Sequence, residues 1–415
     1  MKKLLLIIWF LCLEIGHVAA IGVQPSDSTI VLNGTVKDAH TQRPLANVNV
    51  YVDGKDMGVM TNGDGVFSLK ISREEAEGKI LFSSLGYANG TRTIREMSGN
   101  EESVIYLTPA SRVLDEVTVY GGDAKGLVRE AIQRIDANYS LQASLLHMFY
   151  RETIMKGSRF VGISEGIMDV FKDSYRKRSV AKDRVRMKRG RKLLSQKTRD
   201  TLAVKIQGGP MLALYLDLAK DGGPIFCDEA LSLYSFRHEQ VEMLDNRLHF
   251  VVSFKPIVVM DDPLYSGLLY IDSQSLCLTR AELSLDVSDV DKANKTVLLK
   301  RPIGLRFKCK ESSFVVAYRL HGDRSCLDYV KNTIRFKCDW KRRLFSSAYT
   351  ATAEMVTVDV EKDATAPIPL SESYSKRHLF SDEARRDWDQ DFWKDYNIIE
   401  PTESLEKAVK RLKQK

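Results

Sequence analysis

The sequence predicts a mainly β protein with an N-terminal β-sandwich, a linker helix, and a curved antiparallel β domain that ends in a C-terminal helix. Residues 31–108 alternate apolar and polar side chains between turn signals, which is typical of short strands. Residues 124–138 carry the clearest helical periodicity. Residues 148–362 contain successive hairpin patterns without intervening helices, which favours an antiparallel sheet, curved far enough to form a half-barrel.

The N-terminus has the pattern of a signal peptide over residues 1–20. Two lysines precede the apolar run Leu4–Leu13, and Val18-Ala19-Ala20 forms a small-residue cleavage site. That run is too short to span a bilayer comfortably, and no second long apolar run follows it. We therefore expect a chain secreted into the periplasm or associated with the outer membrane, without a transmembrane segment in its mature form. Residues 21–30 are expected to be a flexible N-terminus.

The first domain, residues 31–108, shows period-2 alternation. Val48, Val50 and Val52 fall on one strand face, and polar residues fall on the other. The doubled turn signal Asn62-Gly63-Asp64-Gly65 predicts a tight hairpin. Its acidic and amide groups do not follow the spacing of a calcium loop, so we interpret the segment as a turn and not as a calcium site.

The segments VLNGTVKDAHTQRPLANVNVYVDG and GVMTNGDGVFSLKI, followed by Leu85-Gly86-Tyr87, resemble the carboxypeptidase regulatory-like (transthyretin-like) domain common in envelope proteins of Bacteroidota. The resemblance implies an accessory module without catalytic residues of its own. It therefore points to a compartment and a class of protein rather than to a reaction.

A linker strand is predicted within residues 109–123, at Glu116–Tyr120, followed by a linker helix and its connection over residues 124–147. Apolar side chains recur at helical spacing within that helix, with charged residues opposite. The apolar positions are Leu127, Val128, Ala131, Ile132 and Ile135.

The β domain, residues 148–362, is predicted from its hairpins. One hairpin turns at Asp245-Asn246, and a second has strands at 267–271 and 276–285. The second contains YIDSQSLCLTRAEL, which resembles the half-barrel of periplasmic lipoprotein carriers. Further strands are predicted at 160–171, 304–310, 313–320, 329–339 and 348–360.

The last segment, residues 363–415, combines an aromatic cluster with a short helix. The cluster consists of Trp388, Phe392, Trp393 and Tyr396, and Thr402 is the predicted N-cap of the helix. We expect both to dock on the β domain rather than to bind a separate partner.

Five cysteines follow the predicted cleavage site, so at least one thiol is unpaired. Their apolar surroundings favour buried free cysteines. In an oxidising compartment one disulfide is possible, and the candidates are Cys309–Cys326 and Cys326–Cys338. No C-x-x-C spacing suggests zinc or redox chemistry.

The sequence offers no convincing catalytic constellation, cofactor motif or metal motif. Its histidines are scattered singly, without the spacing of a zinc peptidase. Gly162-Ile163-Ser164-Glu165-Gly166 matches the letters of a nucleophile elbow, but it lies within a predicted strand where the elbow needs a sharp turn. Asp261-Asp262 precedes a proline and is interpreted as a loop opening. We predict no enzyme activity and no cofactor.

Residues 172–199 contain thirteen basic side chains and two acidic ones, a surplus larger than the formal net charge of +7 for the whole chain. Anionic glycans or lipids are the candidate partners, since nucleic acid is scarce in a periplasm and no aromatic residues interleave for base stacking. The alternative is an edge kept soluble by its charges. The candidate patch consists of Arg176, Lys177, Arg178, Arg184, Arg186, Lys188, Arg189, Arg191 and Lys192.

Two Gly-Gly-Pro breakers bracket the apolar segment MLALYLDLAKD, which we expect to be a short helix or a flap at the mouth of the β domain. Three functional hypotheses follow. The leading one is a non-enzymatic binding or scaffolding protein of the envelope, with an envelope protein or an anionic glycan or lipid as partner. The second is a carrier that shelters a lipid or other amphiphile in its β domain, and the third is an unrecognised hydrolase. The oligomeric state and the ligand do not follow from the sequence.

Overall fold

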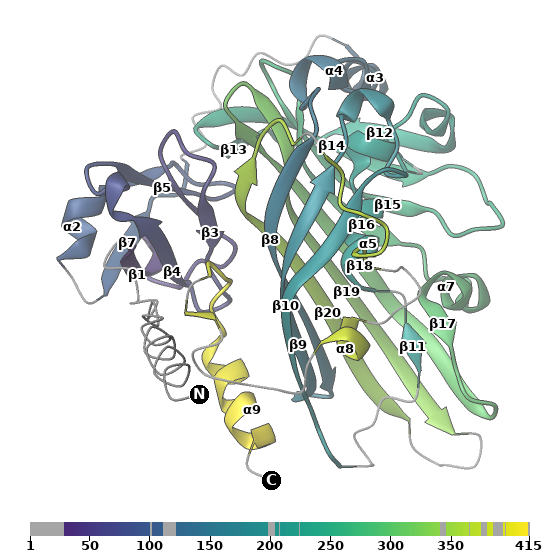
Figure 1. Ribbon diagram of the computed structural model, residues 1–415. Helices are drawn as coiled ribbons and strands as arrows, with labels where there is room; N and C mark the ends of the chain where they lie inside the picture. The colour runs from purple at the N-terminus through teal and green to yellow at the C-terminus, as the bar shows by residue number, and fades with distance from the viewer. Residues whose placement is uncertain are drawn as a thin grey trace, which may run out of the picture.

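The chain forms two β units that lie side by side, with the C-terminal segment against both of them (Figure 1). We describe a computed structural model of the protein. It describes residues 29–99, 102–110, 122–197, 204–206, 208–223, 225–340, 346–364, 366–374, 380–384, 393–394 and 396–413. The predicted signal peptide and the predicted strand Glu116–Tyr120 lie outside these residues. Within them, no helix is long and apolar enough to cross a membrane.

The N-terminal unit is a sandwich of two small sheets. One has the order β4-β1-β7 and the other β3-β2-β5-β6. Apolar side chains from both sheets meet in one core, as the alternation predicts. The strands are β1 (Thr29–Asp38), β2 (Asn49–Val52), β3 (Gly58–Met60), β4 (Val66–Ser72), β5 (Lys79–Ser83), β6 (Gly90–Thr93) and β7 (Ser103–Leu107), and a short helix α2 (Ile94–Ser98) precedes β7.

The linker helix is present but broken in two. Helix α3 (Ala124–Gln133) begins with Asp123 as N-cap, and α4 (Ile135–Asn138) follows after Arg134 leaves the helical conformation. The apolar stripe of α3 is buried against the second β unit, as its periodicity predicts.

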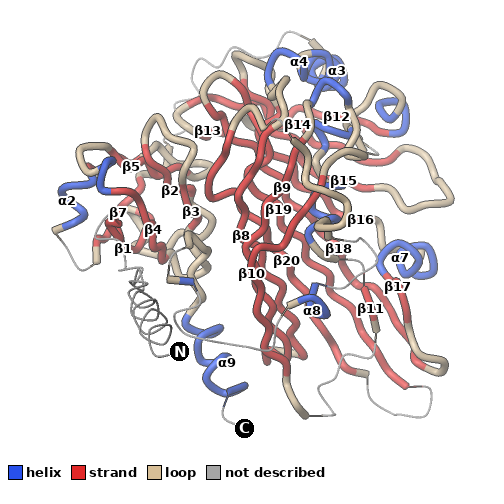
Figure 2. Tube along the Cα trace, in the orientation of Figure 1, coloured by secondary structure: helices blue, strands red, loops and turns tan. Residues whose placement is uncertain are grey.

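The second unit is a single antiparallel sheet of eleven strands that curves strongly without closing (Figure 2). Its order is β10-β9-β8-β20-β19-β18-β16-β15-β14-β12, with β13 also paired to β14. The predicted curved antiparallel sheet is therefore confirmed. The strands are β8 (Ser144–Lys156), β9 (Arg159–Lys172), β10 (Arg184–Leu194), β12 (Tyr234–His238), β13 (Glu242–Leu244), β14 (Arg247–Pro256), β15 (Tyr265–Asp272), β16 (Leu278–Leu285), β18 (Leu305–His321), β19 (Arg324–Trp340) and β20 (Ser347–Glu361).

One expectation about the strands is wrong. Residues 304–310 and 313–320 were expected to form two strands, but β18 is continuous and pairs with β19 along its length. A bulge between Cys309 and Glu311 absorbs one extra residue, so the polar interruption shifts the register without ending the strand. Both predicted hairpins are present, and Asp245 and Asn246 adopt the positive φ angles of a tight turn.

The two faces of the sheet have different coverings. Met148, Tyr150 and Met168 point to the inner face, where they pack against α3–α4 and α5–α6. Phe149 and Ile167 point to the outer face and pack against the C-terminal segment. The inner-face elements are α5 (Pro210–Tyr215), α6 (Leu218–Asp221), α7 (Val290–Val297), α8 (Phe380–Glu383) and the ribbon of β11 (Lys205–Ile206) with β17 (Leu298–Lys300).

The five cysteines among the described residues are free, and neither of the two candidate bridges, Cys309–Cys326 or Cys326–Cys338, forms. Cys309 pairs with Phe336 near one end of the β18–β19 hairpin, whereas Cys326 pairs with Arg319 near the other end. Cys326 and Cys338 lie on one strand, twelve residues and roughly 40 Å apart. Both separations far exceed the reach of a disulfide.

A buried carboxylate on the outer face anchors the C-terminal segment. Glu165 on β9 accepts hydrogen bonds from Arg151 Nε at 2.7 Å, Arg191 Nε at 2.9 Å and Trp393 Nε1 at 3.0 Å. Burial by itself would raise the pKa of Glu165, but the charges of Arg151 and Arg191 lower it. Arg151 also donates to the Ile399 carbonyl, which ties the segment to the sheet.

Helix α9 (Glu403–Lys413) then docks beside this carboxylate. Its N-cap is Thr402, as predicted, and Leu405 and Ala408 pack on Ile163 of β9. Asn62 of the N-terminal sandwich donates to the Pro401 carbonyl, so the Asn-Gly-Asp-Gly turn holds the same segment. Of the predicted aromatic cluster, Trp393 packs edge-to-face against Phe149, while Trp388 and Phe392 lie outside the described residues.

Replacing Glu165 with Gln is expected to release the C-terminal segment, because two buried guanidinium groups would lose their counter-charge. We expect a loss of about 3 kcal/mol in unfolding free energy and faster proteolysis after residue 393. Urea denaturation and limited proteolysis measure these effects. The matched control is Glu372→Gln, which weakens an exposed pair with Arg186 and is expected to cost under about 1 kcal/mol. Equal behaviour of the two variants would contradict the anchoring role.

Candidate functional site

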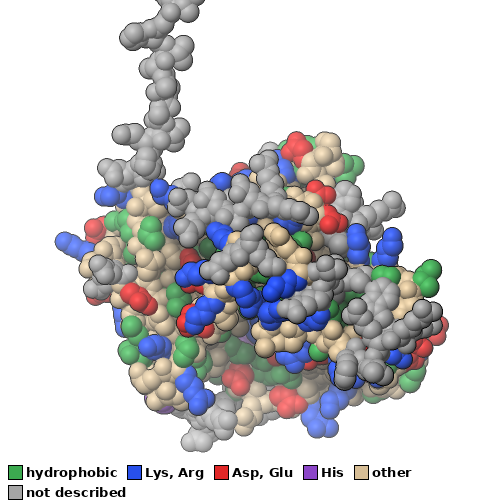
Figure 3. Space-filling model, turned by 90° about the horizontal axis from the view of Figure 1, so that it is seen from below, with side chains coloured by type: hydrophobic (Ala, Val, Ile, Leu, Met, Phe, Trp, Pro, Cys, Tyr) green, Lys and Arg blue, Asp and Glu red, His purple; other side chains and the backbone are tan. Residues whose placement is uncertain are grey.

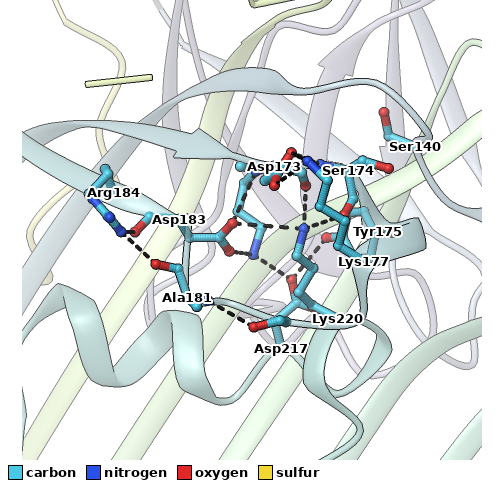
Figure 4. Close-up of polar contacts among 12 residues, drawn as sticks. Ser140, Asp173, Ser174, Tyr175, Lys177, Ala181, Asp183, Arg184, Asp217 and Lys220 are labelled. Atoms are coloured by element: carbon cyan, nitrogen blue, oxygen red, sulfur yellow. Dashed lines mark hydrogen bonds and ion pairs between the residues drawn. The ribbon is translucent and has the colours of Figure 1, made fainter. Parts of the chain in front are cut away.

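Four charged side chains form a buried network on the inner face, at the end of the sheet where β9 finishes (Figure 4). Lys172 Nζ lies 2.5 Å from Asp183 Oδ2 and 2.8 Å from Asp217 Oδ2. Lys220 donates to the backbone carbonyls of Asp173 and Ser174, the latter at 2.6 Å. Asp217 and Lys220 come from the Gly-bracketed apolar segment, so the network fixes that segment to the sheet.

Two tyrosines complete the hydrogen bonding of Asp217. Tyr175 Oη donates to its Oδ2 at 2.9 Å and Tyr318 Oη to its Oδ1 at 3.0 Å. Backbone N–H groups of Leu327 and Ala219 donate in turn to these two hydroxyls. Every charge in the network therefore has partners, which is the condition under which buried ions are tolerated.

The two lysines titrate in opposite directions. Burial by itself would lower the pKa of Lys172, but the carboxylates of Asp183 and Asp217 overcome it and raise the pKa above its ordinary value. Burial lowers the pKa of Lys220 to about 8, and the nearby positive charge of Lys172 contributes to that decrease. Perturbed buried groups often mark functional sites. Here all four charged side chains are inaccessible and saturated, so the network is structural.

A cavity lies on the same inner face, along strands β8, β20 and β19. It contains about 600 Å³ of space outside protein atoms, including solvent at its mouth. Its walls are mainly apolar, and α8, β11 and the Gly208-Gly209 backbone border it. The apolar lining residues are Ile154, Val204, Ile206, Ile334, Ala351, Ala353 and Phe380.

Two polar side chains enter this apolar wall. Glu152 Oε1 accepts hydrogen bonds from Tyr150 Oη at 2.6 Å and from the Gly209 N–H at 3.0 Å. Burial raises the pKa of the Glu152 carboxyl. Asn332 is buried, and within the described chain its Oδ1 has no hydrogen-bond partner. These two acceptors lie among apolar side chains, and the lining also includes the polar residues Thr153, Lys205, Thr352 and Ser381.

The residues of the predicted basic patch are spread over different environments. Arg191 is buried against Glu165 on the outer face, and Arg186 and Lys188 pair with the buried Asp169. Lys192 donates to the Ser381 carbonyl, beside the cavity.

The other five patch residues lie on or before edge strand β10. Lys177 pairs with Asp173, while Arg178 and Arg184 donate to backbone carbonyls. Arg176 and Arg189 are exposed. The patch remains a prediction, with much of its charge directed to partners within the chain.

The other sequence candidates do not converge. Ser164 lies in the middle of β9, paired with Glu152 and Lys192 in neighbouring strands, so it is not on the turn that an elbow requires. No cluster of three His, Cys, Asp or Glu side chains that could hold a metal ion occurs among the described residues.

Sequence reasoning missed the cavity residues. Glu152 and Asn332 each occupy an apolar-facing position of a long strand, and an alternating pattern does not show whether such a polar residue has a partner. The sequence did contain an indication for Asp217 and Lys220. They are single charged residues in the apolar segment MLALYLDLAKD, and a buried charge needs an ion-pair or hydrogen-bond partner.

Replacing Asp217 with Asn is expected to destabilise the β unit by about 3–5 kcal/mol, because Lys172 loses one of two counter-charges inside the protein. The matched control is Asp221→Asn in the same helix, where the side chain is exposed and the expected change is within about 0.5 kcal/mol. Urea denaturation followed by near-UV circular dichroism measures both. A loss for Asp217→Asn as small as for its control would contradict the network's structural role.

The lowered pKa of Lys220 makes stability depend on pH in a defined direction. The pKa is about 8 in the folded chain against 10.5 without the shift, so between these values the unfolded state binds more protons. The unfolding free energy contributed by this group therefore rises with pH across that window. We expect the difference between the wild type and Lys220→Met to grow from pH 8 toward pH 10. A difference independent of pH, measured by urea titrations, would refute the assignment.

Comparison with known proteins identifies the first β unit. Residues 32–119 match the model of the CarboxypepD_reg-like domain. No curated protein matches the chain. The predicted N-terminal sandwich is therefore confirmed as a CarboxypepD_reg-like domain.

Solved structures similar to the chain cover its larger part at low similarity. An outer membrane lipoprotein-sorting protein domain (a provisional name) from Vibrio parahaemolyticus has 12% identity and a TM-score of 0.25, covering 59% of this chain and 93% of that one. A DUF1329 family protein from Desulfovibrio piger has 10% identity and a TM-score of 0.25, covering 59% and 95%. A LolA superfamily protein from Nitrosomonas europaea has 12% identity and a TM-score of 0.24, covering 62% and 100%. At these scores the likeness carries no conclusion about function.

Proposed function

We propose that this protein is a non-enzymatic binding protein of the cell envelope that holds an amphiphile in the inner-face cavity of its β unit. The cavity carries the proposal. Its apolar wall with two acceptor groups favours the carrier hypothesis over pure scaffolding, because a scaffold has no need of an internal space of this kind. The envelope location rests on the signal-peptide pattern of residues 1–20.

The lining defines the chemistry of the guest. The apolar side chains suit an alkyl or other hydrophobic tail, since removing such a tail from water is the main source of binding free energy. The Asn332 amide oxygen and the Glu152 carboxyl both accept hydrogen bonds. The complementary head group therefore carries donors, such as an amine or hydroxyls.

The space in the cavity limits the guest to a short apolar group. About 90 Å³ of it admits a water-sized molecule, which is below the roughly 300–1,000 Å³ common for sites that enclose a whole ligand. Lys205 forms a 3.5 Å ion pair with Asp382, and Lys192 contacts the backbone of α8, so basic residues lie at its border.

Replacing Ala351 with Phe tests the proposal, because the larger side chain would fill the cavity wall. The mature chain, expressed in a periplasm, is analysed by native mass spectrometry and organic extraction. We expect the wild type to carry a stoichiometric amphiphile and Ala351→Phe to lose at least about nine-tenths of it, a cost of about 1.4 kcal/mol in affinity.

The matched control is Ala348→Phe, three residues earlier on the same strand, where the side chain is exposed on the outer face. It is expected to retain the amphiphile. A wild-type chain at its bare sequence mass, or equal loading of both variants, would overturn the proposal. Glu152→Gln then identifies the head group, because only a cationic head needs the carboxylate charge.

A further inference from the structure

A cleft lies between the CarboxypepD_reg-like domain and the second β unit. About 600 Å³ of this interdomain cleft admits a water-sized molecule, against about 90 Å³ in the inner-face cavity. That volume is within the roughly 300–1,000 Å³ common for ligand sites. Tyr51, Asp53 and Asn89 of the domain line one wall, and the ends of β14, β15 and β18 line the other. The cleft shares no lining residue with the inner-face cavity.

Direct contacts between the two units hold the walls of the cleft in place. The Asn89 N–H donates to Asn246 Oδ1 at 2.8 Å, which joins the domain to the turn after β13. Asp56 of the domain accepts a hydrogen bond from His321 Nδ1 at 2.9 Å and pairs with Lys362 at 2.8 Å. The fold therefore sets the distance between the walls, and neither unit forms the cleft by itself.

Two buried polar side chains of the sheet point into the cleft together. His249 and Asp272 lie directly opposite each other in the β14–β15 register, so their side chains are neighbours on one face. The next pair in that register, Phe250 and Ile271, belongs to the inner-face core. Because successive side chains alternate, His249 and Asp272 point to the outer face, where the domain lies.

His249 presents a hydrogen-bond acceptor to the cleft. Its Nδ1 lies 3.0 Å from the Arg247 carbonyl oxygen, and a carbonyl only accepts, so Nδ1 carries the proton. Burial lowers the pKa of His249, which is 2% exposed, so the ring is neutral at pH 7. Nε2 then carries a lone pair, and within the described chain it has no hydrogen-bond partner.

Asp272 presents a second acceptor beside it. Its Oδ1 accepts from the N–H and the hydroxyl of Ser275, both at 2.7 Å. Its Oδ2 is buried and has no hydrogen-bond partner among the described residues. Arg247 Nη1 lies 3.9 Å from that oxygen, beyond hydrogen-bond distance. One half of the carboxylate thus fixes the turn, and the other half faces the cleft.

Asn89 supplies a third acceptor from the opposite wall. Its Oδ1 is buried and unpartnered within the described chain. Three of the ten buried side-chain atoms that lack a partner in that part of the chain therefore line this one cleft, and all three are acceptors. A buried acceptor costs free energy unless a donor reaches it, so a molecule bound here is expected to be rich in donors.

The charge of the lining narrows the class of ligand further. Four aspartates and two arginines line the cleft, and one of these arginines, Arg319, already pairs with Asp328 at 3.0 Å. This excess of carboxylates disfavours an anion. Only Leu81 and Leu320 of the lining are aliphatic, so the cleft does not suit an alkyl tail. Among the described residues no group of three His, Cys, Asp or Glu side chains could hold a metal ion.

The position of the cleft agrees with this charge. It lies at the end of the sheet that β13 and α4 mark at the top of Figure 1. Figure 3 views the other end of the molecule, where Lys and Arg side chains gather around the middle of the face. The acidic lining and the basic surface are therefore at different ends.

We propose that the interdomain cleft binds a saccharide, whose hydroxyl or amino groups donate hydrogen bonds to His249, Asp272 and Asn89. A sugar carries several donors on one rigid ring, so a single molecule reaches acceptors on both walls. Its hydroxyl oxygens also accept, which suits the Arg247 guanidinium at the rim. Water molecules satisfy such acceptors one at a time, and one saccharide replaces several of them. The site does not depend on the amphiphile proposed for the inner-face cavity.

Isothermal titration calorimetry with the full mature chain tests the proposal. The probes are the N-acetylglucosamine tetramer, the glucosamine tetramer and, as an anion, the galacturonic acid tetramer. We expect the wild type to bind at least one of the first two and not the third. His249→Leu should bind at least about tenfold more weakly. The matched control is His40→Leu, an exposed histidine of the domain outside the cleft, which should bind like the wild type.

Asn89→Ala tests the opposite wall and keeps the proposal testable if His249→Leu does not fold, because the contact of Asn89 with Asn246 uses its backbone N–H. We expect binding about fivefold weaker, with the exposed Asn33→Ala as control. Near-UV circular dichroism checks folding. The proposal is overturned if the wild type binds neither of the first two tetramers, or if Asn89→Ala binds like its control.

A further titration with spermidine separates a saccharide site from a site for any cation. Equal or tighter binding of spermidine than of the sugars would overturn the proposal. Ala351→Phe should bind the saccharide like the wild type, because Ala351 lines the inner-face cavity and not the cleft. Failure of the amphiphile site and failure of the saccharide site are therefore distinguishable.

Discussion

The buried network around Asp217 is the constraint on which the inner face depends. A half-barrel has an exposed concave surface, and this chain covers one end of it with a short segment that carries its own charges. Lys172 and Asp183 come from the sheet side, and Asp217 and Lys220 come from the segment. Because removing ions from water is expensive, only the paired arrangement is tolerated, and that requirement holds the segment in one position. One end of the concave face is thereby sealed, and the open space lies toward the other.

The outer face is occupied in a complementary way. Glu165 gathers two arginines and Trp393, and the turn at Asn62 binds the same C-terminal segment. The CarboxypepD_reg-like domain and α9 therefore brace the back of the sheet through a shared segment. None of the residues that line the inner cavity belongs to the CarboxypepD_reg-like domain or to α9, so this bracing of the outer face leaves the cavity uncovered.

The fold followed from local patterns, whereas the site did not. Alternation along residues 160–171 and 348–360 was sufficient to place β9 and β20, because successive side chains of a strand point to opposite faces of the sheet. The bulge in β18 was not predicted, because the polar residues Glu311, Ser312 and Ser313 resemble a turn in the sequence. Glu152 and Asn332 were not predicted for a different reason. Whether a buried polar group has hydrogen-bond partners depends here on neighbours from β20 and the Gly208-Gly209 backbone, which are distant in the sequence.

The contrast between the two ends of the inner face is itself an argument for a guest. At the sealed end, Asp217 receives both tyrosine hydroxyls and a lysine, so no hydrogen-bonding capacity is wasted. At the open end, the Asn332 oxygen has no partner within the described chain, and burial raises the pKa of the Glu152 carboxyl. An unsatisfied buried acceptor costs about 1–3 kcal/mol. Ten buried side-chain atoms of the described chain lack a hydrogen-bond partner, and what distinguishes the Asn332 oxygen is that Asn332 lines the cavity, where a bound molecule could supply the missing donor.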